Sequence, residues 1–205
     1  PTYTYLTANT FTVKHWVKTI NNCYSDTVTH TVTVNPLPTA NFNFSIPTCA
    51  SKLVNFTDAS VPNAGTLSEW SWNFGDPASG TQNTSTLRNP THTYTNAGIY
   101  TVTLTVKTNK GCVSATYTNA TVVVNPRPDA GFISPEVCLD DTYAQFTDTS
   151  SIAGIPLGAG STWSWNIDDP ASGALNSSTL QNPQHSYNTI GTKNVTLIVT
   201  SPSGC

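Results

Sequence analysis

Hydrophobic and polar residues alternate strictly in several short stretches of the chain, which is the pattern of half-buried β-strands. The clearest stretch is Tyr100–Val106, where four apolar residues alternate with three threonines. A second is Trp70–Phe74, where the two-residue period of a strand places Trp70, Trp72 and Phe74 on one face. These faces are expected to build hydrophobic cores.

The strand pattern itself repeats along the chain. Trp70–Asn73 returns as Trp163–Asn166 and Tyr94 as Tyr187, in both cases 93 residues later. A unit of roughly 90 residues has the size of a small β-sandwich and is too long for a solenoid repeat. The residues expected in the cores are Trp70, Trp72, Phe74, Tyr94, Tyr100, Val102, Leu104, Val106, Trp163, Trp165 and Tyr187.

Two Asn-Pro-x-Pro sequences punctuate the repeats, at Asn35–Pro38 and Asn125–Pro128. Prolines at such points end a β-ladder and stiffen a short junction. The predicted domains are therefore the C-terminal part of a repeat at 1–36, a complete repeat at 37–126, and a repeat lacking its last strand at 127–205. Because both ends interrupt a repeat, we interpret the chain as a window on a longer array.

Composition narrows the function classes. Charged residues make up 9% of the chain, and its eight Lys and Arg form no basic cluster, which argues against a nucleic-acid partner. No apolar run approaches the roughly 20 residues of a membrane span, so membrane insertion of this segment is not expected. Five Trp, eight Tyr and seven Phe can supply cores, unlike the composition of a disordered chain.

The segment Trp70–Asp76, followed by Pro90–Tyr94 and Gly98–Val106, resembles the polycystic kidney disease (PKD) domain family. The hallmark of that family is a Trp-x-Phe-Gly-Asp segment followed by a Tyr…Gly-x-Tyr-x-Val strand. The resemblance covers the whole chain, although the third repeat departs from it at Ile167–Asp168 and Lys193. It implies an all-β fold of tandem immunoglobulin-like sandwiches arranged head to tail.

The combination of repeated cysteines with the Asn-Pro-x-Pro junction is similar to repeats of very large Bacteroidetes surface proteins, including gliding-motility adhesins exported by the type IX system. This resemblance implies an extracellular location, attached to the cell surface or secreted. The partners it implies are neighbouring repeats of the same long chain, copies of the chain in a filament, and surface polysaccharide.

Five cysteines occupy two positions of the repeat, which in an exported chain favours disulfides over metal binding or catalysis. In an immunoglobulin-like sandwich the loop before the second strand and the last hairpin lie at opposite ends, too far apart for a disulfide. In a head-to-tail array the first of these loops faces the last hairpin of the next repeat. We favour an interdomain bond, Cys49–Cys205, with Cys23, Cys112 and Cys138 paired outside this window; the alternative is Cys49–Cys112 with Cys138–Cys205.

The tryptophans admit two interpretations. Exposed rings would form a sugar-stacking platform, whereas the shared strand face favours a core position for Trp70, Trp72, Trp163 and Trp165. Trp16 aligns with Thr105 on the outward face. It is the candidate for an exposed contact, with packing on a neighbouring domain or loop as the alternative.

Acidic and histidine side chains offer little chemistry. Asp76, Asp168 and Asp169 are the calcium candidates, but hydrogen bonding in turns is favoured because the acids lack the ligand spacing of a known calcium loop. No other cofactor is expected. His92 and His185 are interpreted as structural, hydrogen-bonded imidazoles.

No catalytic residue is predicted, because no serine or acid lies in a nucleophile elbow or other catalytic motif. The tripeptide at 26–28 resembles a Bacteroidetes O-glycosylation pattern, which makes Thr27 a candidate modification site.

The function predicted from the sequence is a non-enzymatic stalk or filament segment that displays an adhesive region. Two alternatives stay open. In one, the repeats are carbohydrate-binding accessory modules of a secreted hydrolase. In the other, they associate laterally into an extracellular fibre.

Overall fold

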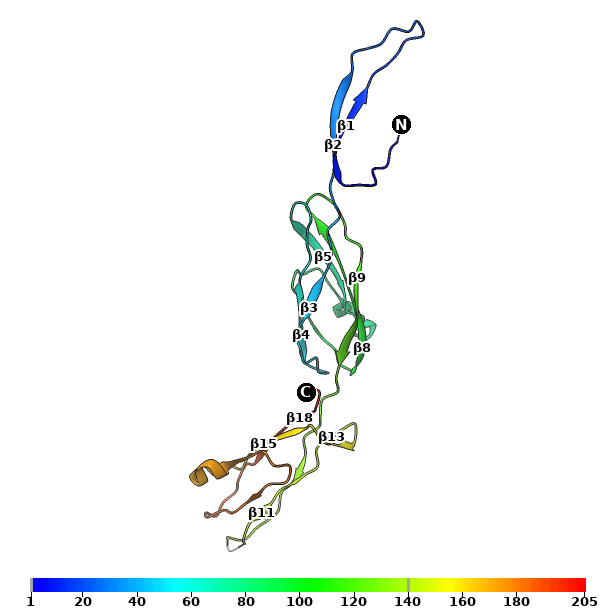
Figure 1. The fold of residues 1–205 in the computed structure, drawn as a ribbon. Helices are drawn as coiled ribbons and strands as arrows, with labels where there is room; N and C mark the ends of the chain where they lie inside the picture. Colours follow the sequence, from blue (N-terminus) through cyan, green and yellow to red (C-terminus); the bar gives the residue numbers. More distant parts are fainter. Residues whose placement is uncertain (1, 140) are drawn as a thin grey trace. The chain divides into compact units, whose positions relative to one another are not determined.

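The computed structural model describes residues 2–139 and 141–205, with the side chain of residue 120 excepted, and it is drawn in Figure 1. Two compact units divide the chain. The first comprises Pro1–Phe44, Asn55–His92 and Tyr100–Thr121, and the second comprises Ser45–Val54, Thr93–Ile99 and Val122–Cys205. No helix in these residues is long and apolar enough to cross a membrane.

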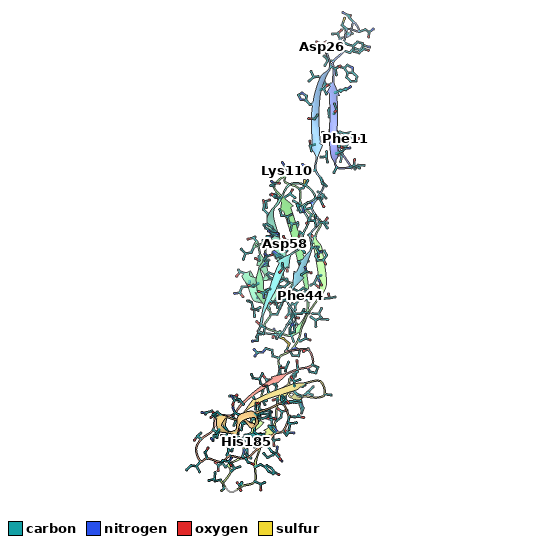
Figure 2. All side chains as sticks on the ribbon, turned by 60° about the vertical axis from the view of Figure 1, so that its left-hand side comes forward. Phe11, Asp26, Phe44, Asp58, Lys110 and His185 are labelled. Carbon is teal, nitrogen blue, oxygen red and sulfur yellow. A yellow bond between two sulfur atoms is a disulfide. The ribbon has the colours of Figure 1, made fainter. Side chains whose placement is uncertain are left out.

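Residues 1–36 contribute one antiparallel hairpin. Strand β1 (Asn9–His15) pairs with β2 (Val28–Val34), with Asn9 opposite Val34 and His15 opposite Val28. Phe11, labelled in Figure 2, stacks on Tyr5 at a ring-centroid distance of 4.4 Å. Most residues of the hairpin are exposed, including the apolar Val13 and Val32.

The middle repeat builds two antiparallel sheets, one ordered β3-β4-β7 and the other β6-β5-β8-β9. A bulge interrupts the β5–β8 register between Leu67 and Glu69. The elements are β3 (Phe42–Phe44), β4 (Leu53–Asp58), β5 (Leu67–Asn73), the 3₁₀ helix η1 (Pro77–Asn83), β6 (Thr84–Ser85), β7 (Thr91–Thr93), β8 (Gly98–Thr108) and β9 (Tyr117–Val124).

Aromatic side chains form the core of the first unit. Trp72 is 1% exposed, and its ring contacts those of Phe42, Phe56 and Phe74 at centroid distances of 5.1–6.3 Å. The strict alternation along β8 buries Leu104 and its neighbours two positions away, Val102 and Val106, as the pattern predicts.

The third repeat uses shorter strands. Its sheets are ordered β16-β15-β18, β10-β12, β11-β17 and β13-β14. Its core packs Ala144, Phe146, Trp165 and Ile167, all buried. The elements are β10 (Phe132–Ile133), β11 (Ala144–Gln145), β12 (Thr147–Asp148), β13 (Ser151–Ile152), β14 (Ile155–Pro156), β15 (Thr162–Asn166), η2 (Pro170–Asn176), β16 (Ser177–Ser178), β17 (Gln184–His185) and β18 (Thr196–Thr200).

The prediction of an all-β fold of immunoglobulin-like sandwiches is confirmed. Four of the predicted core residues are only half-buried, however: Trp70, Tyr100, Trp163 and Tyr187. The two tryptophans share the inward face of their strands, but their rings reach polar side chains at the rim. Arg88 lies over the ring of Trp70, and the indole N–H of Trp163 donates to Asp148.

Candidate functional site: the cystine junction

The loop between β3 and β4 presents the first cysteine. Residues 45–50 leave β3 through the cis peptide Ile46–Pro47, and Thr48 and Cys49 are then buried. This loop belongs to the second unit, together with all residues from Val122 onward. The loop that carries Cys49 therefore belongs to the same compact unit as the third repeat.

Asn125, the residue after β9, holds this loop through its main chain. Its N–H donates to the carbonyl of Thr48 at 2.9 Å, and its carbonyl accepts from Ala50 N–H at 2.8 Å. The Thr48 hydroxyl donates to the carbonyl of Val123, and the Asn125 amide reaches Thr48 O at 3.3 Å. The result is a short parallel ladder, with Cys49 opposite Asn125, directly before the proline-rich junction.

A tight turn after β18 presents the second cysteine. The N–H of Ser201 donates to the carbonyl of Cys205 at 2.7 Å, and Gly204 N–H returns to Ser201 O at 2.9 Å. Gly204 has φ +83°, and an added Cβ would meet Pro47 at 3.3 Å. The positive φ favours a glycine here, and any larger residue would also crowd Pro47.

The structure joins Cys49 and Cys205 in a disulfide, with Cα atoms 5.7 Å apart. The alternative pairs within single repeats, Cys49–Cys112 and Cys138–Cys205, are therefore not formed. Cys23 and Cys138 are free and exposed, and Cys112 is free and half-buried. Because the bonded residues are 156 positions apart, the bond closes a loop that includes most of both repeats.

Cys112 lies in surroundings that match those of Cys205. Its sulfur is 4.0 Å from the carbonyl oxygen of Asn35, and the sulfur of Cys205 is 4.0 Å from that of Asn125. The backbone N–H of Thr108 donates to Cys112 O at 2.9 Å, as Ser201 N–H does to Cys205 O. The two turns therefore place their cysteine sulfur atoms next to the Asn of an Asn-Pro junction in the same way.

A buried imidazole–carboxylate pair involves the residue directly before each 3₁₀ helix, Asp76 before η1 and Asp169 before η2. Nε2 of His92 lies 3.1 Å from Oδ2 of Asp76, and Nε2 of His185 lies 2.9 Å from Oδ2 of Asp169. All four residues are buried. Each histidine is thus hydrogen-bonded to one of the calcium candidates: His92 to Asp76, and His185 to Asp169.

The third calcium candidate also has a protein partner. Asp168 has φ +61°, in the position of Gly75, and its Oδ2 accepts from Asn194 N–H at 2.7 Å. Within the described residues no group of three or more His, Cys, Asp or Glu could hold a metal ion. The described contacts of these carboxylates are thus hydrogen bonds within turns and the core.

The aromatic and modification candidates differ in exposure. Trp16 is 54% exposed, Thr27 is exposed, and Trp72 and Trp165 are buried. The remaining two tryptophans, Trp70 and Trp163, differ in the hydrogen bonding of their indole N–H groups. Nε1 of Trp163 donates to Asp148 at 2.8 Å, whereas Nε1 of Trp70 is buried without a hydrogen-bond partner.

Asp148 collects further donors at this rim. Burial raises the pKa of its carboxyl, but hydrogen bonds from Ser150, Gln181 and Trp163 outweigh burial, so that the pKa lies below its ordinary value. Burial, followed by the charges of Asp169 and Asp168, raises the pKa of the Tyr187 hydroxyl.

Residues 35–124 match the PKD domain family. The PKD match spans the complete repeat, from the first Asn-Pro junction to the end of β9. Two solved PKD domains are similar in sequence. The PKD1 domain of Vibrio anguillarum Epp is 30% identical and covers 46% of this chain and all of that domain, with a TM-score of 0.37. The PKD1 domain of the Vibrio cholerae metalloprotease PrtV is 32% identical over 44% of this chain and 99% of that domain, also with a TM-score of 0.37.

Curated relatives are parts of much longer proteins. Collagenase ColA of Bacillus cereus is 32% identical over 138 residues, which is 65% of this chain and 14% of the collagenase. Collagenase ColQ1 of Bacillus cereus strain Q1 is 32% identical over 123 residues, or 58% of this chain and 12% of the collagenase. The matched segment thus spans about one seventh or less of these relatives.

Two features of the junction were not predicted from the sequence: the hydrogen bonds of Thr48 and the ladder role of Asn125. The recurrence of Asn35 and Asn125 before Pro-x-Pro was the available signal, but it indicated a chain stop and gave no partner. That partner, Thr48, lies 77 positions away from Asn125.

Proposed function

We propose that this chain is a non-catalytic spacer of an extracellular repeat protein, a stalk segment that holds an adhesive region away from a surface. The observation that supports this most directly is the Cys49–Cys205 disulfide, which links consecutive repeats across the Asn-Pro-x-Pro junction. A disulfide of this kind suits an oxidising, extracellular location.

The junction is stiffened by more than the covalent bond. Four main-chain and side-chain hydrogen bonds join the Thr48 segment to Val123 and Asn125 at the end of β9, and Pro126 and Pro128 follow at once. Interfaces between domains of one chain usually permit relative motion unless they are large. A cystine placed at the junction replaces a large interface as the means of restricting that motion.

Outward threonines and asparagines keep such a segment soluble without charge. With charged residues at 9%, the repeats interact little through exposed charges, so their arrangement depends weakly on ionic strength. These properties suit a spacer whose length must stay constant in varying media. The type IX export and gliding-motility role suggested by the repeat pattern belong to the same proposal.

Small-angle X-ray scattering of the oxidised chain tests the spacer function. We expect one conformer to fit the oxidised chain, and a broad ensemble to be needed after reduction or for the Cys49→Ser, Cys205→Ser double variant. A Cys23→Ser variant is the matched control, because Cys23 is free and exposed. Equal flexibility of the oxidised chain and the double variant would refute a stiffening role.

A second candidate function is that of an accessory module of a secreted hydrolase that binds carbohydrate. The sequence match to the two collagenases favours an accessory module, and Trp16 is an exposed ring on which a sugar could stack. Pull-down on insoluble polysaccharides separates the candidates: retention that is lost in Trp16→Ala would favour binding, and no retention would favour the spacer.

A further inference from the structure

The middle and third repeats each build one rim of their sandwich on an aspartate, Asp58 in the middle repeat and Asp148 in the third. The backbone N–H of each aspartate donates to an asparagine side chain, to Asn89 Oδ1 at 2.9 Å and to Asn182 Oδ1 at 2.8 Å. One carboxylate oxygen of each accepts from the backbone N–H of the serine two residues later, at 3.0 Å. The two rims thus share one frame, and they differ in the groups that reach the second carboxylate oxygen.

In the third repeat, uncharged donors reach that oxygen. Nε1 of Trp163 donates to Asp148 Oδ2 at 2.8 Å, and Nε2 of Gln181 donates to the same atom at 3.1 Å. The indole and the amide therefore both have an acceptor within the repeat. This rim satisfies its own donors and presents no cation.

In the middle repeat, Arg88 stands at the position of the glutamine and takes the carboxylate oxygen from the tryptophan. Nε of Arg88 donates to Asp58 Oδ2 at 3.3 Å, and the guanidinium carbon lies 5.8 Å from the centroid of the Trp70 ring. Nε1 of Trp70 is buried, with no hydrogen-bond partner among the described residues. A buried donor without an acceptor destabilises a fold. Because the third repeat forms the same frame without this penalty, folding alone does not account for the placement of Arg88.

Arg88 is held from below and open above. The Asp58 side chain is 0% exposed, whereas the Arg88 side chain is 64% exposed. Asp58, labelled in Figure 2, is the acceptor that the described residues give to this guanidinium, so its terminal Nη groups are free to bind a ligand. Asn89 is exposed, and because its Oδ1 accepts from Asp58, its Nδ2 remains as a further donor. All of these residues belong to the first unit.

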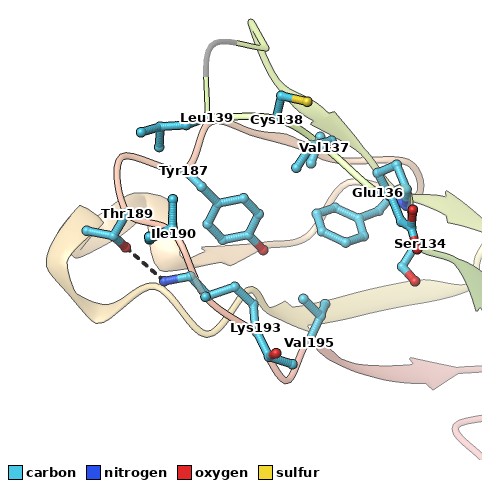
Figure 3. A pocket seen from close by; sticks show the side chains of 15 residues that line it. Ser134, Glu136, Val137, Cys138, Leu139, Tyr187, Thr189, Ile190, Lys193 and Val195 are labelled. Atoms are coloured by element: carbon cyan, nitrogen blue, oxygen red, sulfur yellow. Dashed lines mark hydrogen bonds between the residues drawn. The ribbon is translucent and has the colours of Figure 1, made fainter.

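Lys193 shows how a cation over an aromatic ring differs from this arrangement. Its Nζ lies 5.3 Å from the centroid of the Tyr187 ring, where both residues line a cavity of the third repeat. The same Nζ donates to the Thr189 hydroxyl at 3.1 Å, as Figure 3 shows. An ammonium is a point charge, whereas a guanidinium is a planar fork whose donors match the two oxygens of a carboxylate. Stacking of a cation on a ring is therefore not enough to make the site that Arg88 makes.

We propose that Arg88, Asn89 and Trp70 form a binding site for a carboxylate-bearing sugar, a hexuronate unit of a polysaccharide. The sugar carboxylate accepts two parallel hydrogen bonds from the guanidinium fork, which is a strong and directional pairing. The Asn89 amide donates to a hydroxyl oxygen of the same sugar, and the apolar face of the sugar ring covers the exposed part of the Trp70 indole. This binding adds a function to the proposed spacer and does not depend on it.

The charge around the site favours an isolated carboxylate over a dense polyanion. Arg88 is already paired with Asp58, and the chain as a whole has a net charge of −3 with only eight Lys and Arg. A nucleic acid or a run of acidic residues in a peptide would gain little attraction here. A uronate brings one charge together with hydroxyl groups and an apolar ring face, which match the fork, the amide and the indole. The rim of the third repeat, where Gln181 is neutral, should bind no uronate.

Titration of the oxidised, ¹⁵N-labelled chain with trigalacturonate, followed by NMR, tests the site. We expect saturable shifts of the Trp70 indole N–H and the Arg88 Nε–H signals. Binding should weaken at least about tenfold in Arg88→Gln, and likewise for the methyl-esterified trisaccharide. Arg127→Gln is the matched control, because Arg127 is exposed and its loss removes the same charge, and Lys193→Gln removes a cation from another ring. The absence of saturable shifts, equal binding by Arg88→Gln and Arg127→Gln, or equal binding of acid and ester would overturn the proposal.

Further variants separate binding from folding and from other ligands. Glutamine is the residue at the matching position of the third repeat, so Arg88→Gln should let the Trp70 indole donate to Asp58, and its urea midpoint should not fall; a lower midpoint would contradict the argument. Arg88→Lys keeps the charge without the fork and should bind as weakly as Arg88→Gln. A polyglutamate peptide that shifts the same two signals as strongly as the trisaccharide would contradict the sugar assignment. Binding lost in Trp16→Ala but kept in Arg88→Gln would place the sugar on the hairpin instead. If trigalacturonate does not bind while scattering shows a rigid chain, this site fails and the spacer function stands.

Discussion

Mechanical extension offers the sharpest test of the junction. If the chain is pulled from its two ends, the Cys49–Cys205 bond carries the tension past everything between these residues. The bonded residues are 156 positions apart, and an extended chain spans about 3.3–3.6 Å per residue, so the bond conceals about 510–560 Å of contour length. Only the residues up to Cys49 can then be drawn out.

Single-molecule force spectroscopy with handles at both termini measures this directly. The oxidised chain should release about 160–180 Å in total. Reduction, or the Cys49→Ser, Cys205→Ser double variant, should restore the remainder as separate unfolding events of the β-sandwiches. Cys138→Ser should behave like the unsubstituted chain, because Cys138 is free.

The bond should also stabilise both repeats in solution. Loop-closure entropy for a loop of this length amounts to about 5 kcal/mol, and measured disulfides usually contribute about 2–4 kcal/mol. Urea unfolding of the double variant against the oxidised chain gives the value. Release of the full contour length by chains whose Cys49–Cys205 bond has been verified by mapping would refute the force-bypass reasoning.

Three other outcomes follow from the cores and rims. Leu104→Ala should cost about 2–5 kcal/mol of unfolding free energy in urea titrations, since Leu104 is 0% exposed; a loss below about 1 kcal/mol would contradict its core position. His92→Ala should cost about 3–5 kcal/mol, because it leaves the Asp76 carboxylate buried without its imidazole, and Asp76→Asn should cost less than this. The folded-state pKa of Asp148 lies below its unfolded value, so its stabilisation is present at neutral pH and disappears as the pH falls through the folded pKa. Asp148→Asn should therefore flatten the decline in stability that begins as the pH approaches the ordinary Asp pKa of about 3.9 from above, and Trp163→Phe should flatten it in part; an unchanged decline would refute the assignment.

Sequence periodicity predicted the fold well because the information it needs is local. The alternation along Tyr100–Val106 indicated a strand with a buried face, and the structure has that face buried from Val102 to Val106. The same reasoning placed Trp70 in the core, where it is only half-buried. A two-residue period identifies the face of a strand but not the distance of a residue from the margin of the sheet.

The candidate site was predicted less completely, because it depends on contacts between distant residues. The spacing of the cysteines led to Cys49 and Cys205 once the order of loops in the sandwich was assumed. Neither the Thr48–Asn125 hydrogen bonds nor the Asp76–His92 pair leaves a periodic trace, since each joins residues from separate segments of the chain and at least one partner lies outside the strands.

The separation of the two bonded cysteines also orders events in time. Synthesis and folding proceed from the N-terminus, so Cys49 exists as a thiol while the next 156 residues are still being added. The middle sandwich can complete its core during that interval, because none of its buried residues waits for Cys205. The bond can form only after Cys205 has been added to the chain. Formation of the Cys49–Cys205 disulfide therefore reports that the Ser201–Cys205 turn of the third repeat lies beside Cys49.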